Sequence, residues 1–132
     1  MMKRHELRDY FRHGRILVAK ESYAIVKSRR ALTDAFAVVR DEKETSSVIE
    51  ESRLRNQKVL GIEGDWRRIT FDMILPFSLI GFFAHVSGVL AREGIPIFAI
   101  SAYSTDHLFV KNKDLDRAVK ALEKLGFAVR RI

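Results

Sequence analysis

The chain has 132 residues, 47% of them hydrophobic, and a formal net charge of +7. This hydrophobic fraction, with nine Phe residues, excludes a disordered polypeptide and predicts a globular protein of one or two small domains. The absence of cysteine excludes disulfides, thiolate nucleophiles and zinc sites built from thiolates, so stability must come from packing.

The basic residues are spread over the whole sequence. Pairs of Lys or Arg occur at residues 3–4, 29–30, 67–68 and 130–131, interleaved with Asp and Glu. A solvated surface with a basic bias explains this pattern more simply than a concentrated nucleic-acid-binding face. The charged start lacks the apolar stretch of a signal peptide, and no run of ~18 apolar residues predicts a membrane span. We therefore expect a cytoplasmic protein with no membrane partner.

The N-terminal half, residues 1–64, is expected to be a small module that packs against the rest, because chains below ~60 residues are marginal alone. Apolar segments predict its elements in chain order: strands at 16–19, 23–26 and 35–39, polar turns at 20–22 and 27–34, a short apolar segment at 48–49, and a corner at 61–65.

The C-terminal half, residues 65–132, has the clearer pattern. Apolar and polar residues alternate over 69–73, which is typical of a strand with one buried face. Apolar residues at helical spacing then predict a helix over 79–93, with Ser78 as its cap and Gly94 at its end.

The rest of this half predicts two strands, a helix and a last strand. Its elements are a strand at 95–101, a turn at 102–105, a strand at 108–110, a helix from Asp114 to Gly126, and a strand at 127–132. The order βαββαβ is ferredoxin-like, so we predict an α+β fold with an antiparallel sheet and the helices on one face. Many unrelated functions use this fold.

No catalytic motif is found in the sequence. The four His residues show no metal-ligand spacing, and the Gly-Ile-Glu-Gly run at 61–64 lacks the Lys and Ser or Thr of a phosphate loop. We therefore expect no enzyme activity, no metal and no cofactor.

Two features suggest binding of a small zwitterion. At residues 78–81 a loop meets a helix start, where free amides and the helix dipole favour a carboxylate, and Gly81 would allow close approach. At 101–107, Asp106 could pair with an ammonium group while Tyr103 forms a pocket wall. The alternatives are that Gly81 only relieves crowding between helix and sheet, and that Asp106 only caps a turn.

Four segments together carry a family resemblance. They read DWRRITF (65–71), PFSLIG (76–81), EGIPIFAIS (93–101) and TDHLFV (105–110), and ETSSV at 44–48 fits more loosely. This combination closely resembles the bacterial and archaeal ACT-domain proteins related to the CASTOR arginine sensors. The resemblance implies a tandem ACT fold, with an ACT-like half at 1–64 and an ACT domain at 65–132, and a regulatory protein that binds an amino acid.

The resemblance also implies a ligand site between the two modules. Carried over to this sequence, its residues are Ser47, Val48, Leu79, Ile80, Gly81, Phe82, Ala102, Tyr103 and Asp106. Asp106 would bind the ammonium group of the ligand. The animal arginine sensors place an acidic residue just before the glycine, where this chain has Leu79 and Ile80, so we expect an apolar or small amino acid rather than arginine.

Partners and alternatives follow from the same reasoning. ACT modules commonly join sheet to sheet, so we expect a homodimer, with a metabolic enzyme as the regulated partner. A basic ferredoxin-like nucleic-acid-associated module is the alternative. It is suggested by a pI of about 10.0 and weakened because the central strands lack the exposed aromatic pair on which bases stack. A structural subunit with a vestigial pocket is a third reading.

Overall fold

The computed structural model describes residues 4–132, and their side chains from Glu6 onward. The chain forms two compact units, which we call unit 1 (residues 1–20 and 67–132) and unit 2 (residues 21–66). Two strands, β1 (Arg15–Ser28) and β4 (Gly61–Phe71), contribute residues to both units. The predicted domain boundary between residues 64 and 65 remains a prediction.

Unit 1 contains most of the regular structure. Beside its parts of β1 and β4, its elements are α1 (Arg4–His13), α2 (Phe82–Arg92), β5 (Ile97–Ser101), β6 (Asp106–Lys111), the 3-10 turn η2 (Asn112–Asp114), α3 (Leu115–Leu125) and β7 (Ala128–Arg131). The strand–helix–strand–strand–helix–strand order predicted for the C-terminal half is confirmed by β4, α2, β5, β6, α3 and β7.

The strand order in unit 1 differs from that of an isolated ferredoxin-like unit. The order is β7-β1-β4-β6-β5, so β1 lies between the first and last strands of the βαββαβ series. β1 pairs in parallel with β7, with Ile16 opposite Val129, and β5 pairs antiparallel with β6. The N-terminal segment therefore completes the sheet of unit 1.

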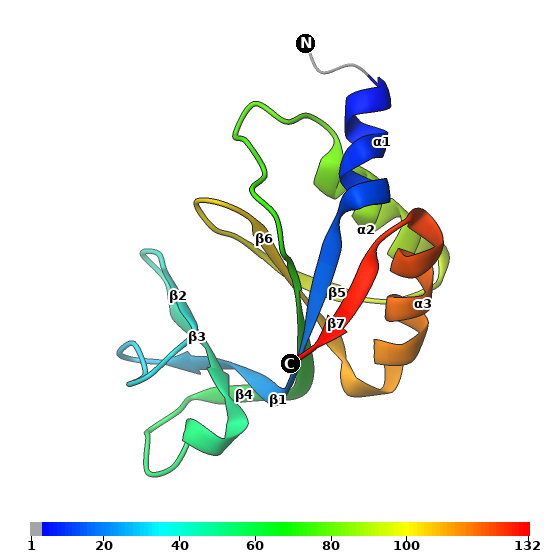
Figure 1. Cartoon of the computed structure of the whole chain (residues 1–132). Coiled ribbons are helices and arrows are strands. Elements are labelled where there is room, and N and C mark those ends of the chain that lie inside the picture. Colours follow the sequence, from blue (N-terminus) through cyan, green and yellow to red (C-terminus); the bar gives the residue numbers. More distant parts are fainter. Residues whose placement is uncertain (1–3) are drawn as a thin grey trace. The chain divides into compact units, whose positions relative to one another are not determined.

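The helices of unit 1 cover one face of this sheet, as Figure 1 shows. Apolar residues recur at helical spacing on α2 and α3 and at every second position of the strands, so both meet in one core. Four aromatic residues form its centre: Phe71 of β4 packs on Phe82 and Phe127 with ring centroids 5.2 and 5.4 Å apart, and Phe11 of α1 packs on the same two rings. The prediction of helices on one face is confirmed within this unit.

The start of α2 differs from the prediction. The helix begins at Phe82 and its N-cap is Gly81, in the left-handed conformation with φ 86°. Ser78 does not cap it, because the residues before Gly81 form a turn in which the Leu79 amide donates to the Pro76 carbonyl at 2.9 Å. A left-handed residue at the helix entrance interrupts the helical path, so the helix starts three residues later than the apolar pattern suggests.

Unit 2 is made of strands and one short 3-10 turn. Its elements are β2 (Ala37–Arg40), β3 (Thr45–Glu50), η1 (Glu51–Arg53) and its parts of β1 and β4, in the order β2-β3-β1-β4. A small apolar cluster made by Ala24, Val26, Leu32 and Ile49 packs within it. Residues 21–66, all of them described, contain no α-helix, so the structure does not show a second βαββαβ unit.

Two predicted interruptions of the N-terminal half are wrong. Residues 20–22 continue β1 instead of forming a turn, and 61–65 belong to β4 instead of forming a corner. The Lys20 amide donates to the Ile132 carbonyl at 3.1 Å, so pairing continues through polar side chains. Because no Gly or Pro lies at 20–22, nothing in the backbone forces a turn there.

The charge of the chain is divided unevenly between the units. Unit 1 contains sixteen Lys and Arg against eight Asp and Glu, whereas unit 2 contains eight against nine. The basic excess of the chain therefore belongs to unit 1.

Candidate functional site

A hollow of about 300 Å³ in unit 1 contains most of the predicted ligand-binding residues. The loop before α2 and the turn between β5 and β6 form its two sides. Its lining comprises Leu75, Pro76, Phe77, Leu79, Gly81, Phe82, Phe83, Ala84, Ser101, Ala102, Tyr103, Thr105 and Asp106. Six of the nine predicted residues are in this set: Leu79, Gly81, Phe82, Ala102, Tyr103 and Asp106.

The helix-side wall of this hollow is the N-terminus of α2. The first bond of the helix runs from the His85 amide to the Gly81 carbonyl at 3.0 Å, so the amides of residues 82–84 precede the intrahelical ladder. These amides and the positive end of the helix dipole favour a carboxylate. No Lys or Arg lines the hollow, so an anionic group would have to bind to these amides.

Gly81 is required by its backbone conformation. A Cβ atom at this position would meet only the side chain of Leu7, at an ordinary contact distance of 3.7 Å. Relief of crowding between helix and sheet therefore does not explain this glycine, whereas its φ of 86° does.

The opposite wall is a turn held firmly by main-chain bonds. The Ala102 amide donates to the Thr105 carbonyl at 2.9 Å, and the Leu75 amide donates to the Ser104 carbonyl at 2.7 Å. The Thr105 hydroxyl donates to the Phe71 carbonyl at 2.6 Å. These bonds fix the turn against the segment that leaves β4, so the two walls of the hollow are positioned before any ligand arrives.

Asp106 is the single charged residue in the lining of this hollow. It is half-buried at the start of β6, and its carboxylate makes no hydrogen bond or ion pair with the described part of the chain. The turn is closed by its backbone and by Thr105, so Asp106 does not serve as the turn cap. An acceptor of this kind, facing a pocket, suits an ammonium group.

Exposed apolar side chains surround this hollow. The rings of Phe77 and Tyr103 meet edge to face with centroids 5.2 Å apart, although 79% and 83% of these residues are exposed. Ile74 and Ile80 on the same loop are also exposed. Sequence reasoning missed Phe77, Leu75 and Thr105 as lining residues, although Pro76 marked this segment as an irregular loop.

The remaining predicted residues lie elsewhere. Ile80 is adjacent to the hollow and does not line it. Ser47 and Val48 are buried in unit 2, where the Ser47 hydroxyl accepts the Leu32 amide at 3.2 Å and the Val48 carbonyl accepts the Phe36 amide at 2.7 Å. Both residues therefore have structural contacts of their own, and their contact with a ligand remains a prediction.

A polar chain of three residues lies on the sheet face that the helices leave open. The Arg68 guanidinium donates to the Thr70 hydroxyl at 2.5 Å, and that hydroxyl lies 2.8 Å from Nδ1 of His107. Burial lowers the pKa of His107 below its ordinary value of 6.5, and the positive charge of Arg68 lowers it further, whereas the carboxylate of Asp106 opposes the shift.

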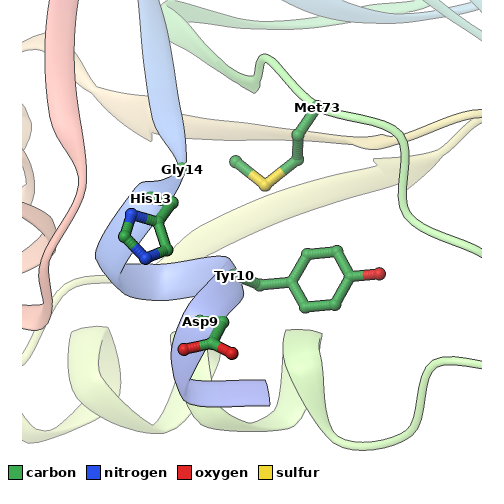
Figure 2. Close-up of a pocket in the computed structure, with 5 residues that line it drawn as sticks. All are labelled: Asp9, Tyr10, His13, Gly14 and Met73. Carbon is green, nitrogen blue, oxygen red and sulfur yellow. The ribbon is translucent and has the colours of Figure 1, made fainter. Parts of the chain in front are cut away.

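A second hollow in unit 1, of about 260 Å³, lies where α1 meets β1 and is lined by Asp9, Tyr10, His13, Gly14 and Met73 (Figure 2). Its wall is mainly apolar. Gly14 cannot be replaced here without movement, because an added Cβ would lie 2.3 Å from the Tyr10 carbonyl oxygen and 2.6 Å from the Met73 methyl group.

Two further searches of residues 4–132 concern metals and membranes. Those residues contain no group of three or more His, Cys, Asp or Glu side chains arranged to hold a metal ion. Within the same range, every helix is too short or too polar to cross a bilayer.

Comparison with known families points to a regulatory class of domain. Residues 61–124 match the family model of the ACT domain, so this part of the chain is similar to ACT domains. None of the curated proteins matches the sequence. The tandem arrangement implied by the CASTOR-like resemblance is left as a prediction.

Solved structures share the fold at low sequence identity. A protein from Agobacterium tumefaciens has a TM-score of 0.77 and 24% identity, covering 90% of this chain and 93% of that chain. A Vibrio cholerae protein of unknown function, described as a possible transport protein, has a TM-score of 0.73 and 20% identity, covering 92% of this chain and 96% of that chain. The ligand-free regulatory subunit of aspartate kinase from Thermus thermophilus has a TM-score of 0.62 and 8% identity, covering 85% of this chain and 95% of that chain.

Proposed function

We propose that this protein is a regulatory module that binds a free amino acid in the hollow between the α2 entrance and the β5–β6 turn, without catalysis of its own. One observation carries the proposal. Residues 82–84 at the start of α2, whose amides precede the intrahelical bonds, line the same hollow as Asp106, and its other lining residues are uncharged. A zwitterion has opposite charges that match these two groups.

The proposed binding mode uses each wall for one part of the ligand. The α-carboxylate accepts hydrogen bonds from the amides of residues 82–84, and the ammonium group donates to Asp106. The side chain of the ligand lies against Leu79 and Tyr103. A volume of about 300 Å³ is at the small end of ligand pockets, which fits a single amino acid.

The lining also favours a particular class of amino acid. Once Asp106 binds the ammonium group, no second carboxylate remains for a cationic side chain. A buried charge without a partner is unfavourable, so arginine and lysine should bind weakly. We therefore infer an apolar or small side chain.

The comparisons support a regulatory role. The regulatory subunit of an aspartate kinase has a fold similar to that of this chain, and residues 61–124 match the ACT-domain model. The proposal includes a homodimer, a metabolic enzyme as the regulated partner, a cytoplasmic location, and ligand contacts by Ser47, Val48 and Ile80. The cytoplasmic location rests on the composition of the sequence, and the other parts rest on the resemblance to the CASTOR-like proteins.

A thermal-shift screen against the twenty amino acids tests the proposal. A ligand present at ~100 times its Kd adds ~2.7 kcal/mol to the stability of the folded state. The expected result is a shift with one or a few apolar or small amino acids that Asp106→Asn abolishes. Asp116→Asn is the matched control, because it removes the same charge from an exposed position on α3 outside this hollow.

Two outcomes would contradict the proposal. An unchanged ligand response in Asp106→Asn would show that the carboxylate does not bind the ammonium group. A response to arginine stronger than that to every apolar amino acid would refute the inferred ligand class.

A further inference from the structure

Unit 2 contains a larger hollow with the opposite electrostatic character. Its volume is about 780 Å³. The lining residues come from two segments of the chain and are Arg29, Arg30, Ala31, Leu32, Gln57, Lys58, Val59 and Leu60. Three of these eight residues are cations, and none is acidic.

The floor of this hollow is apolar and continuous with the small core of unit 2. Leu32 is 8% exposed and belongs to the cluster with Ala24, Val26 and Ile49, and Val59 packs against that cluster. Leu60 is 62% exposed beside it. The hollow therefore combines an apolar surface with a rim of positive charge, a combination that ligand pockets share.

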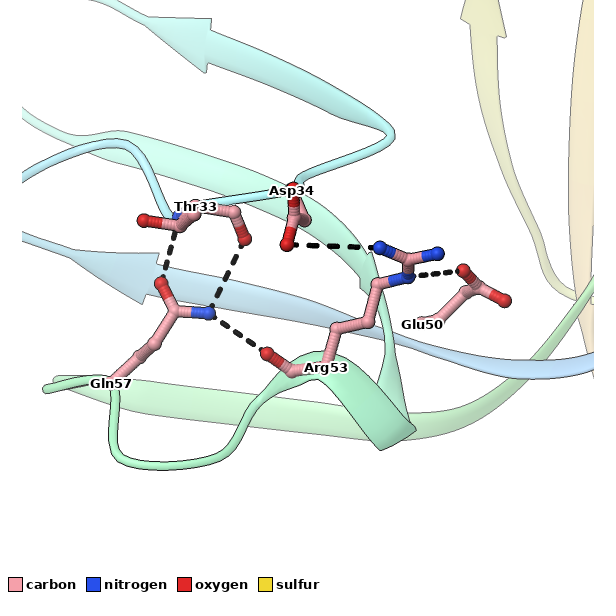
Figure 3. A network of polar contacts seen from close by, with 5 residues as sticks. All are labelled: Thr33, Asp34, Glu50, Arg53 and Gln57. Carbon is pink, nitrogen blue, oxygen red and sulfur yellow. Dashed lines mark hydrogen bonds and ion pairs between the residues drawn. The ribbon is translucent and has the colours of Figure 1, made fainter.

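Hydrogen bonds hold the two lining segments together. The Gln57 side-chain oxygen accepts the Thr33 amide at 2.8 Å, and its nitrogen donates to the carbonyls of Thr33 and Arg53 at 3.3 and 2.9 Å (Figure 3). At the other end of the hollow, the Leu60 amide donates to the Lys27 carbonyl at 2.7 Å. We call the three hydrogen bonds of the Gln57 side chain the Gln57 clamp. Together with the Leu60–Lys27 bond, the clamp holds the backbone of the two lining segments together before any ligand binds.

The three cations of the rim have no internal counter-charge. The side chains of Arg29, Arg30 and Lys58 make no hydrogen bond or ion pair with the residues that the structure describes, although the Arg30 backbone carbonyl accepts the Ser28 hydroxyl at 2.5 Å. Arg53, close by in the sequence, is compensated by Glu50 at 2.7 Å and Asp34 at 3.7 Å (Figure 3). Side chains of unit 2 therefore neutralise one arginine and leave the rim cations for another molecule.

Two of the three acidic side chains on the neighbouring surface have contacts of their own. Arg29 and Arg30 also line an adjoining hollow that includes Asp41, Glu42 and Glu44. The Asp41 carboxylate accepts the backbone amides of residues 43 and 44, both at 2.8 Å, and Glu44 lies 3.9 Å from Lys27. Within the described residues, none of the three carboxylates makes an ion pair with Arg29 or Arg30.

We infer that this hollow is a second ligand site, which binds a phosphate-bearing small molecule. Two adjacent guanidinium groups present forked donors that match phosphate oxygens, and Lys58 adds a point charge. The organic part of the ligand lies on Val59 and Leu60. The inference does not depend on the amino-acid site, because its residues belong to unit 2.

Isothermal titration calorimetry with inorganic pyrophosphate, and with a nucleoside diphosphate, tests this site on the full chain. Wild type should bind both saturably, and the nucleoside diphosphate more tightly. Arg29→Gln with Arg30→Gln should weaken both at least tenfold. Arg40→Gln with Arg55→Gln is the matched control, because it removes the same charge from unit 2 outside this hollow and should change both affinities less than twofold.

Further variants separate the parts of the site. Lys58→Gln should weaken pyrophosphate binding by itself, which keeps the test decisive if the double variant is poorly folded. Leu60→Ser should weaken the nucleoside diphosphate and leave pyrophosphate unchanged.

Three results would overturn the inference. Equal losses in both double variants would mean that binding reflects net charge alone. Tighter binding of citrate than of pyrophosphate would refute the phosphate class. Saturable binding of a short RNA with none of pyrophosphate would make this surface a nucleic-acid contact. Amino-acid shifts should persist in Arg29→Gln with Arg30→Gln, so failure here leaves the first proposal intact.

Discussion

The two units are stabilised in different ways. Unit 1 has a large apolar core in which Phe11, Phe71, Phe82 and Phe127 pack on one another between helices and sheet. Unit 2 has a small aliphatic cluster and depends on side-chain hydrogen bonds such as the Gln57 clamp to position its loops. Substitutions should therefore have large global effects in unit 1 and smaller, local effects in unit 2.

The hollows of the two units differ in a parallel way. The hollow of unit 1 is bounded by regular elements and main-chain bonds, and contains one carboxylate. The hollow of unit 2 is bounded by loops held by a side chain, and contains three cations. Backbone hydrogen bonds persist when side chains are substituted, so ligand binding in unit 1 should depend on few side chains. Binding in unit 2 should depend on the Gln57 clamp as well as on the three cations.

The largest effect is expected for Phe71→Ala. Phe71 is fully buried at the centre of the aromatic core, so the variant should lose about 3–5 kcal/mol of unfolding free energy, measured by urea denaturation. Phe77→Ala, at an exposed ring, should change it by less than about 0.5 kcal/mol. A loss in Phe71→Ala no larger than that in Phe77→Ala would contradict the assignment of stability to this core.

A smaller loss is expected for Gly14→Ala. The new methyl group would lie 2.3 Å from the Tyr10 carbonyl oxygen, which is backbone and cannot rotate away, so overpacking should destabilise the protein by about 1–3 kcal/mol. Gly88→Ala is the control, in which we expect the free energy of unfolding to increase instead of decrease. Its methyl group meets only the Arg92 side chain at 3.7 Å, and Ala in a helix interior should add about 0.5–1 kcal/mol. Thermal or urea unfolding of both variants decides the comparison.

The sequence predicts the parts of unit 1 whose partners are near in the chain. Alternation over 69–73 and helical spacing after Gly81 result from burial on one face, so the strand and helix order of the C-terminal half is correct. Local patterns also marked Gly81 and Asp106, at a helix entrance and a turn, as candidates, and the structure places both in the lining of one hollow.

Features that depend on distant pairing could not be read from the sequence. β1 continues through Lys20 because Ile132, at the far end of the chain, supplies its partner. The cationic hollow brings the Arg29–Arg30 pair beside Lys58 through Gln57, whose role no local pattern indicates. The basic pair alone resembled an ordinary solvated surface. Only the folded arrangement shows that, among the described residues, its side chains make no ion pair with the carboxylates of the adjoining hollow.

A still smaller, local effect is expected for Gln57→Ala. Loss of the clamp should cost about 1–2 kcal/mol, because each net hydrogen bond contributes about 0.5–1.5 kcal/mol and the three lie partly in solvent. Hydrogen exchange of the Thr33 amide should become faster, while amides of β6 in unit 1 remain protected. Gln57→Glu keeps the acceptor oxygen and should preserve protection at Thr33. Equal acceleration of exchange in both units would contradict a local role for the clamp.

The smallest expected effect is the pH dependence of stability that His107 contributes. Asp106, the charged residue of the unit 1 hollow, precedes His107 in β6 and influences its pKa. Because burial and Arg68 lower the pKa of His107, the folded state favours the neutral imidazole, and the unfolded state binds more protons. The stability due to His107 is therefore complete above pH 6.5 and is lost as the pH falls through its folded pKa. His107→Gln should remove this part of the acid-induced loss.

Titration of the His107 imidazole by NMR sharpens this prediction. Asp106 raises the pKa of His107 against the two larger effects, so Asp106→Asn should lower that pKa further, and Arg68→Gln should raise it. An amino acid whose ammonium group pairs with Asp106 would partly neutralise the carboxylate and lower the pKa of His107 as Asp106→Asn does. Saturation with a ligand that left the pKa unchanged, or raised it, would place the bound ammonium group away from Asp106.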